Sequence, residues 1–194
     1  MTRPVAVAIT GGIGAGKSEA LAAFARAGAA TVSSDEIVHE LLRRDDVRDQ
    51  VARRFGAGVV GADGALDRAA IAAVVFNDRD ALEWLEALLH PLVAAEYLSW
   101  REALARRERP PRVSVTEVPL LYETGAEARF DRVVVITAPE AVRRGRSGAP
   151  PDLRERRLLP DEEKVARADY SYVNAGTLAE LERFVSSVLD DVTR

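Results

Sequence analysis

Short apolar runs alternate along the chain with longer stretches whose apolar residues recur at helical spacing. Short runs of apolar and β-branched residues predict five strands, at residues 4–10, 31–33, 113–118, 132–137 and 170–173, of which 4–10 and 132–137 are expected to be buried. Amphipathic stretches predict helices at residues 17–27, 161–168 and 177–192. Strands that alternate with helices predict an α/β fold, with a parallel sheet covered by helices on both faces.

Residues 36–111 are predicted to be almost entirely helical. A glycine-rich loop at 56–64 interrupts them, and His90–Pro91 is expected to end one helix and start the next, because proline suits a first helical turn. A segment of about 75 residues exceeds an ordinary connection between strands. We therefore expect a core domain from 1–35 and 112–194, with 36–111 inserted as an acceptor-binding domain.

Composition narrows the class of protein. The formal net charge of −4 argues against a dedicated nucleic-acid binder, and the absence of cysteine excludes disulfides, thiolate metal sites and a catalytic cysteine. No apolar run approaches the ~18 residues of a membrane span, so we expect a cytoplasmic protein with no membrane partner. Lysine occurs only at Lys17 and Lys164, among 25 arginines, which makes both lysines conspicuous. The sequence leaves the oligomeric state open.

Residues 11–18 read GGIGAGKS and match the phosphate-loop pattern G-x-x-x-x-G-K-[ST] in full. A predicted strand precedes the motif and a predicted helix follows it, as phosphate binding by backbone N–H groups requires. Lys17 is expected to reach the β- and γ-phosphates of ATP, and Ser18 to ligate Mg²⁺. A turn that merely joins strand to helix would need neither residue. The guanine motif N-K-x-D cannot occur, because Lys164 follows Glu163, so a small-molecule kinase fits best.

Two carboxylates end predicted strands. Asp35 follows the second strand, where it either accepts a proton from an attacking hydroxyl or caps the next helix; spacing leaves both open. Glu117 ends the third strand, the usual position of an acid that contacts Mg²⁺ through water; the alternative is a solvated strand-end charge. By position alone, His90 is more often a cap or a packed side chain than a functional residue.

A basic stretch follows the fourth strand and suggests a mobile lid near residues 143–160. Its early arginines are Arg143, Arg144 and Arg146. On a helix, Arg143 and Arg146 share a face, whereas Arg144 points roughly 100° away. We expect Arg143 and Arg146 to neutralise charge on the transferred phosphoryl group, and Arg144 to be solvated. The alternative is a solvated basic face. The later arginines of the stretch are Arg154, Arg156 and Arg157.

The chain resembles dephospho-coenzyme A kinases over nearly its whole length. The resemblance is carried by the blocks AITGGIGAGKS, SSDEIVHELL, LDRAAIAAVVFND, LLHPLV, EVPLLYETG and EEKVARADYSYVNAGT, in the family's order and spacing. It implies phosphorylation of the ribose 3′-hydroxyl of dephospho-CoA by ATP, on a P-loop kinase core with a helical CoA-binding domain and a lid.

The resemblance also implies roles for individual residues. It makes Asp35 the catalytic base, and Asn174 a neighbour of the adenine of ATP. With the motif, it gives the candidate nucleotide-binding residues as Gly12, Ile13, Gly14, Ala15, Gly16, Lys17, Ser18, Glu19 and Asn174. It gives the candidate residues of the acceptor cleft as Thr10, Asp35, His90, Pro119 and Leu120. The alternatives are another P-loop small-molecule or nucleoside monophosphate kinase, and, because the lid looks short, a nucleotide-binding module with impaired transfer chemistry.

Overall fold

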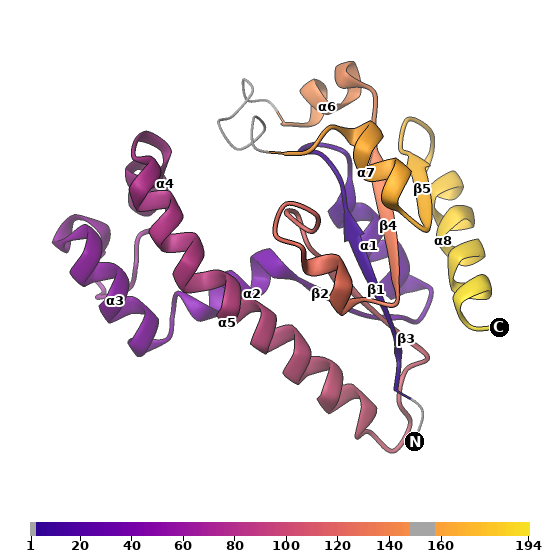
Figure 1. The fold of residues 1–194 in the computed structure, drawn as a ribbon, viewed down its shortest axis with the longest axis horizontal. Helices are drawn as coiled ribbons and strands as arrows, with labels where there is room; N and C mark the ends of the chain where they lie inside the picture. The colour runs from indigo at the N-terminus through magenta and orange to yellow at the C-terminus, as the bar shows by residue number, and fades with distance from the viewer. Residues whose placement is uncertain (1–2, 148–157) are drawn as a thin grey trace. The chain divides into compact units, whose positions relative to one another are not determined.

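The structure, a computed structural model of the chain, describes residues 3–147 and 158–194. A five-stranded parallel sheet with strand order β2-β3-β1-β4-β5 lies at its centre (Figure 1). The strands are β1 (Val5–Thr10), β2 (Ala30–Ser33), β3 (Val113–Glu117), β4 (Arg132–Thr137) and β5 (Tyr170–Val173). Ile9 of β1 and Ser33 of β2 both pair with Glu117, so these three strands end at the same edge of the sheet. The predicted α/β fold is confirmed.

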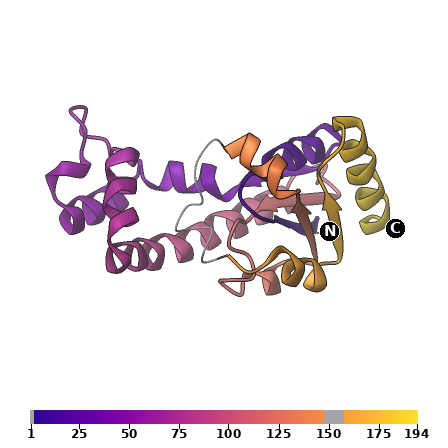
Figure 2. The same cartoon turned by 90° about the horizontal axis from the view of Figure 1, so that it is seen from above.

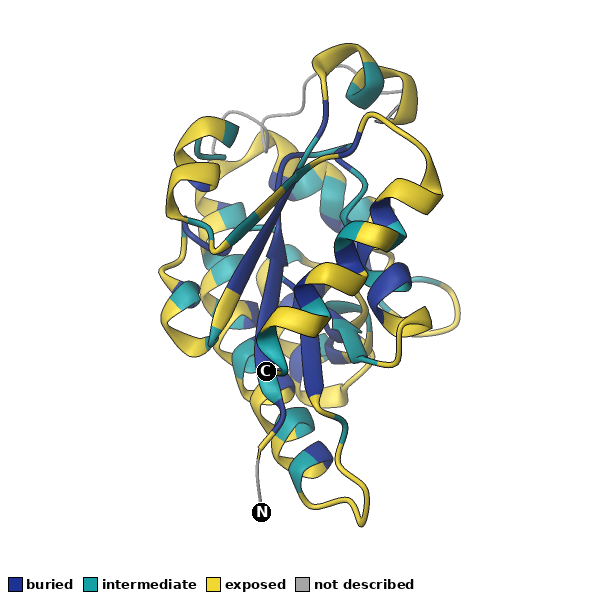
Figure 3. Ribbon diagram, turned by 90° about the vertical axis from the view of Figure 1, so that its right-hand side faces the viewer, coloured by how far each residue is buried: buried dark blue, intermediate teal, exposed yellow. Residues whose placement is uncertain are grey.

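One face of the sheet is covered by α1 (Lys17–Arg26) and α8 (Leu178–Val192), which lie together on one side of the strands in Figure 2. Val7 and Ile9 of β1 face these helices, and Phe24 of α1 packs against them, fully buried. Leu181, Val185 and Val188 of α8 complete this cluster. The buried strands and the exposed outer faces of the helices stand out in Figure 3.

The opposite face is covered by the segment that follows β3 and by α7 (Asp161–Arg167). Ala8 of β1 points to this side, because side chains alternate along a strand. Leu121 and Tyr122 follow β3 and pack here, just before the short 3₁₀ helix η2 (Ala126–Arg129). Leu159 and Ala168, at the two ends of α7, anchor that helix to the same cluster.

Contacts divide the chain into two compact units, Met1–Ser34 with Trp100–Arg194, and Asp35–Ser99. The second unit is helical, as the sequence predicts for this region. The helices that it contains, wholly or in part, are α2 (Ser34–Leu41), α3 (Asp45–Phe55), the 3₁₀ helix η1 (Ala57–Val59), α4 (Arg68–Asn77) and α5 (Arg79–Ala105).

The predicted helix break at His90–Pro91 is wrong. Helix α5 runs from Arg79 to Ala105 with Pro91 inside it. Proline in a helix removes one backbone hydrogen bond, at a cost of about 3 kcal/mol. Apolar residues at four-residue intervals continue across the proline and are buried on both sides of it: Leu85, Leu89, Val93 and Tyr97. Burial of one continuous apolar stripe outweighs the lost bond, so the helix continues.

The predicted lid near 143–160 lies only partly within the described residues. Helix α6 (Glu140–Ser147) carries its first three arginines. Residues 148–157 of the predicted lid lie outside the described residues, and its later arginines Arg154, Arg156 and Arg157 are among them. Within residues 3–147 and 158–194, no helix combines the length and apolar character needed to cross a membrane.

Candidate active site

The phosphate loop connects the end of β1 to the first turn of α1. Gly16 precedes the helix with φ of 94°, in the left-handed region where a side chain is strained. A Cβ at this position would also overlap Nδ2 of Asn174. Asn174 follows β5, is buried, and donates from Nδ2 to the carbonyl of Ala15 at 2.9 Å. The structure therefore places Asn174 directly against the loop, where only glycine fits at position 16.

Lys17 and Ser18 open helix α1. Lys17 is half-buried and donates from Nζ to the carbonyl of Gly12 at 3.1 Å, which folds its ammonium group back over the loop. Ser18 is exposed. Glu19 turns instead towards the end of its own helix, where its carboxylate accepts a hydrogen bond from Arg26 at 2.9 Å. A cation over the loop and the positive end of a helix dipole both favour an anion here.

Arg143 of α6 reaches the phosphate loop. A Cβ on Gly12 would lie 2.6 Å from Nη1 of Arg143 and 3.3 Å from Oδ1 of Asp161. Arg143 and Asp161 form an ion pair at 3.4 Å, with the arginine side chain 24% exposed. Its Nε is buried and makes no hydrogen bond to any residue that the structure describes. The loop thus has a guanidinium group against it, which pairs with the carboxylate of Asp161.

The other two described arginines of the stretch differ in their surroundings. Arg146 directs Nη1 at the carbonyl oxygens of Ala15, at 3.3 Å, and Gly14, at 3.5 Å. Arg144 pairs with Glu140 one turn earlier on α6, and both side chains are about 70% exposed. Arg143 and Arg146 therefore contact the loop and Arg144 does not.

The end of β3 brings further candidates to the same edge of the sheet. Glu117 is only 5% exposed, so the alternative of a solvated strand-end charge is wrong. Thr10, at the end of β1, is fully buried and donates from Oγ1 to the carbonyl of Pro119 at 3.3 Å. Leu120 is half-buried beside it in the chain. The structure therefore brings Thr10 and Pro119 into contact.

Asp35 and His90 belong to the helical unit. Helix α2 begins at Ser34, so Asp35 is exposed in its first turn, one residue inside the helix and not before it as the sequence predicts. His90 lies in the middle of α5 and is exposed. It is therefore neither a cap nor a packed side chain, and a role in binding stays open to it.

Sequence reasoning missed Asp161 altogether. It follows Pro160 at the start of α7, where an acidic residue is favourable in any helix, so its sequence position gives no distinct signal. The sequence marks Lys164 as conspicuous without giving it a role, and it gives no signal for Glu123. The structure joins these two in a buried ion pair of 2.9 Å. The rarity of lysine in this chain was the one available signal.

The donor set fits magnesium held mainly through phosphates. Among the described residues, no group of three or more histidine, cysteine, aspartate or glutamate side chains could hold a metal ion. Mg²⁺ on nucleotides usually needs only one or two protein oxygens, the other ligands being phosphates and water. The Ser18 hydroxyl and the buried Glu117 carboxylate are donors of this kind.

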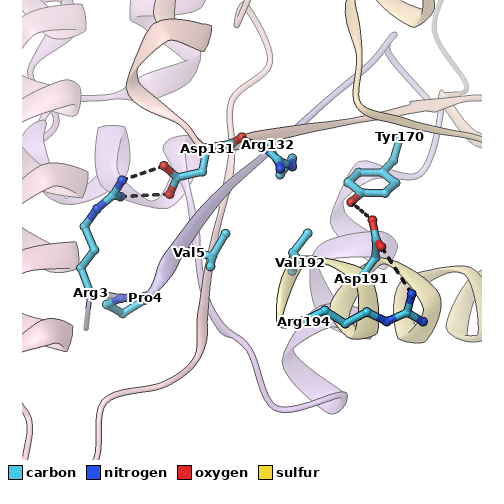
Figure 4. A pocket seen from close by; sticks show the side chains of 9 residues that line it. All are labelled: Arg3, Pro4, Val5, Asp131, Arg132, Tyr170, Asp191, Val192 and Arg194. Atoms are coloured by element: carbon cyan, nitrogen blue, oxygen red, sulfur yellow. Dashed lines mark hydrogen bonds and ion pairs between the residues drawn. The ribbon is translucent and has the colours of Figure 1, made fainter. Parts of the chain in front are cut away.

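A pocket of about 420 Å³ lies at the other edge of the sheet (Figure 4). Val5, Arg132 and Tyr170 line it, and each is the first residue of its strand. Arg3 and Asp131 form a two-pronged ion pair at 2.7 and 2.9 Å on its wall. Burial pushes the pKa of Asp131 up, but the hydrogen bonds from Arg3 and the N–H of Ala6 outweigh it and hold that pKa below its usual range. This pocket is remote from the phosphate loop, which follows the opposite ends of the strands.

Comparisons with known proteins agree on one family. The sequence model of the dephospho-CoA kinase family matches residues 5–180. The dephospho-CoA kinase of Mesorhizobium japonicum is 38% identical over 197 residues, covering 97% of this chain and 96% of that protein. A crystal structure of a Thermus thermophilus protein superimposes with a TM-score of 0.80 at 36% identity, over the full length of both chains. The dephospho-CoA kinase of Campylobacter jejuni shares the fold, with a TM-score of 0.67 at 22% identity over 96% of each chain.

Proposed function

The chain belongs to the dephospho-CoA kinase family, and from that premise we propose how its residues transfer the γ-phosphoryl group of ATP to dephospho-CoA. Membership makes the chain an ATP-dependent kinase. In the proposed reaction the 3′-oxygen of the ribose forms a bond to the γ-phosphorus. The bond from that phosphorus to the β–γ bridging oxygen breaks, and the products are coenzyme A and ADP.

The phosphate loop binds the nucleotide. Backbone N–H groups of Gly12–Ser18 surround the phosphates, and Lys17 neutralises the β- and γ-phosphates. Ile13, Gly14 and Ala15 contribute backbone, and Asn174 lies beside the loop as the candidate contact to adenine. Glu19, which pairs with Arg26, supports the start of α1. The observation that carries this proposal most directly is the close packing of Gly12 and Gly16 against Arg143 and Asn174.

Ser18 and Glu117 would hold Mg²⁺, Ser18 directly and Glu117 through water. When bound, the ion neutralises charge on the β- and γ-phosphate oxygens. Glu117 is suited to this role because burial keeps its carboxylate at the strand end.

The acceptor is activated by Asp35. Its carboxylate takes the proton from the ribose 3′-hydroxyl as the oxygen attacks phosphorus. Thr10, Pro119 and Leu120 line the acceptor side at the edge of the sheet, and His90 contributes from the insertion 36–111, which binds dephospho-CoA. Asp35→Asn removes the proton acceptor and keeps the shape, so kcat should fall by about 10²–10⁴ with little change in ATP affinity.

Arg143 and Arg146 act on the transferred group. Negative charge spreads over the equatorial oxygens in the transition state, and Lys17 compensates it from one side only. Arg143 lies against Gly12, where its guanidinium group can meet a bound phosphate while Asp161 keeps it in place.

ADP release with different acceptors tests the proposal. The protein, ATP and Mg²⁺ are incubated with dephospho-CoA, with AMP, or with no acceptor. We expect rapid ADP release only in the incubation that contains dephospho-CoA. Equal release with AMP would indicate a nucleoside monophosphate kinase, and slow release under all three conditions would indicate a binding module without transfer chemistry.

A further inference from the structure

Glu123 and Lys164 form an ion pair inside the layer that covers the β1–β4 face opposite α1 and α8. Lys164 is completely buried, and its Nζ lies 2.9 Å from Oε1 of Glu123, whose side chain is 12% exposed. Oε2 of Glu123 is buried and makes no hydrogen bond to any residue in 3–147 or 158–194. A buried ion pair adds little stability over an apolar pair of similar volume. Stability alone therefore does not account for it.

The pair connects three segments of the molecule. Glu123 ends the segment that begins at Pro119, whose carbonyl accepts the hydrogen bond from Thr10. The same Oε1 that meets Lys164 also accepts the backbone N–H of Leu159 at 2.9 Å. Glu123 thereby holds both the chain that enters α7 and the middle of α7 itself.

Helix α7 carries this connection to the phosphate loop. Asp161 lies three residues before Lys164, and residues at that spacing share a helix face. Asp161 pairs with Arg143 at 3.4 Å, beside Gly12. A rotation or slide of α7 would move Asp161 away from Arg143, so the position of the arginine depends on how firmly α7 is held.

We propose that Glu123 and Lys164 are positioning residues for phosphoryl transfer: their ion pair fixes α7 so that Asp161 holds Arg143 against the phosphate loop. This inference rests on the proposed function, in which Arg143 acts on the γ-phosphoryl group. Other anchors keep the helix folded without the pair. Arg167 pairs with Glu127 and lies over the ring of Tyr122, 4.2 Å from its centroid, and the partly buried Leu159 and Ala168 pack against the sheet.

The test removes the pair without leaving a buried charge. In the double variant Glu123→Gln/Lys164→Met, the glutamine oxygen still accepts the N–H of Leu159 and the methionine fills the lysine volume. We expect kcat to fall by about 10- to 100-fold, the loss that a misplacement near 1 Å produces, while KM for dephospho-CoA stays unchanged. The matched control is Val188→Ala in α8, on the other face of the sheet, which weakens the core and leaves kcat at the wild-type value.

A double-mutant cycle separates positioning from general support. Asp161→Asn should lower kcat in the wild-type background and have little further effect in the double variant, because the pair acts through Asp161. The inference would be overturned if Asp161→Asn lowered kcat by the same factor in both backgrounds. It would also be overturned if the kcat of the double variant stayed within twofold of wild type. If the double variant does not fold, Glu123→Asp, which keeps the charge on a shorter side chain, takes its place.

A binding measurement keeps this test independent of the acceptor. The dissociation constant of a non-hydrolysable ATP analogue should rise about 3- to 10-fold in the double variant, and Arg143→Gln should add nothing to that rise. Additive effects would again overturn the inference. If the wild type binds the analogue but does not phosphorylate dephospho-CoA, the proposed function fails, and the binding cycle still decides whether the pair positions Arg143.

Discussion

Replacing Arg143 and Arg144 separately tests which arginine acts on the transferred phosphoryl group. The two are adjacent on α6 and differ in their contacts. Arg143 is 24% exposed, faces Gly12, and pairs with Asp161. Arg144 is 71% exposed and pairs with Glu140. Glutamine at each position removes the charge and keeps most of the side-chain length.

The expected magnitudes follow from these environments. A unit charge at about 4 Å, at an effective dielectric constant near 20, contributes about 4 kcal/mol. Arg143 has a carboxylate partner, and the ground state of ATP shares part of this interaction, so about 2–4 kcal/mol is specific to the transition state. Arg143→Gln should therefore lower kcat by roughly 30- to 10³-fold. The exposed Arg144–Glu140 pair stabilises α6 by about 0.3–0.5 kcal/mol, and kcat of Arg144→Gln should stay within about twofold of wild type.

The assay measures the rate of ADP release at saturating ATP with dephospho-CoA as the acceptor. Unfolding in denaturant confirms that both variants fold. A ratio of kcat values above about ten between Arg144→Gln and Arg143→Gln would support the assignment. Equal, small effects would refute it. The acting arginine would then lie among Arg154, Arg156 and Arg157, or the chain would transfer phosphate without one.

Three further predictions concern the loop, a helix cap and acid stability. Gly16→Ala should weaken ATP binding at least about tenfold, because the added Cβ meets Asn174. The control is Gly28→Ala, which has the same φ of 94° and open space around it, and which should cost about 1 kcal/mol of stability and leave ATP binding unchanged. Equal ATP affinities of the two variants would contradict this prediction. Thr177→Ala breaks the capping box with Glu180 at the start of α8 and should lower the free energy of unfolding by about 1 kcal/mol, measured by urea denaturation; no change would mean that the box is not formed. Because the folded-state pKa of Asp131 is depressed, its contribution to stability is present above the unfolded value of about 3.9 and lost as pH falls through the folded value. Arg3→Gln should reduce that loss below about pH 4, and identical pH profiles for the two proteins would show that the pair is not formed in solution.

Strands β1, β3 and β4 could be predicted because each is a short, buried run rich in β-branched residues. The two outer strands, β2 and β5, are only partly buried. The same pattern failed at Pro91, where local propensity predicts a break. Whether the helix continues through Pro91 depends on the free energy gained by burying Leu85, Leu89 and Val93 along one stripe. That gain must exceed the free energy lost with one hydrogen bond. Propensity is local, and the gain comes from packing.

Candidate residues that belong to a motif could be found in the same way. Lys17 and Ser18 stand in a pattern whose spacing the chemistry dictates. Asp161 could not be found, because it lies beside Gly12 although the two are about 150 residues apart in the sequence, and it occupies an ordinary position for an acid in a first helical turn. The pairing of Glu123 with Lys164 likewise exists only once α7 has packed on the sheet. Contacts across such distances follow from the fold and not from any local pattern.

The position of the new phosphate group decides whether the ribose 3′-hydroxyl of dephospho-CoA is the acceptor. Wild-type protein is incubated with ATP, Mg²⁺ and either dephospho-CoA or its 3′-deoxyribose analogue, and the products are analysed by phosphorus NMR and mass spectrometry. We expect one new phosphomonoester on the ribose 3′-oxygen, formed in equal amount with ADP, and no product from the 3′-deoxy analogue. ADP formed at the same rate with the 3′-deoxy analogue, or a phosphoryl group found at another position, would contradict it.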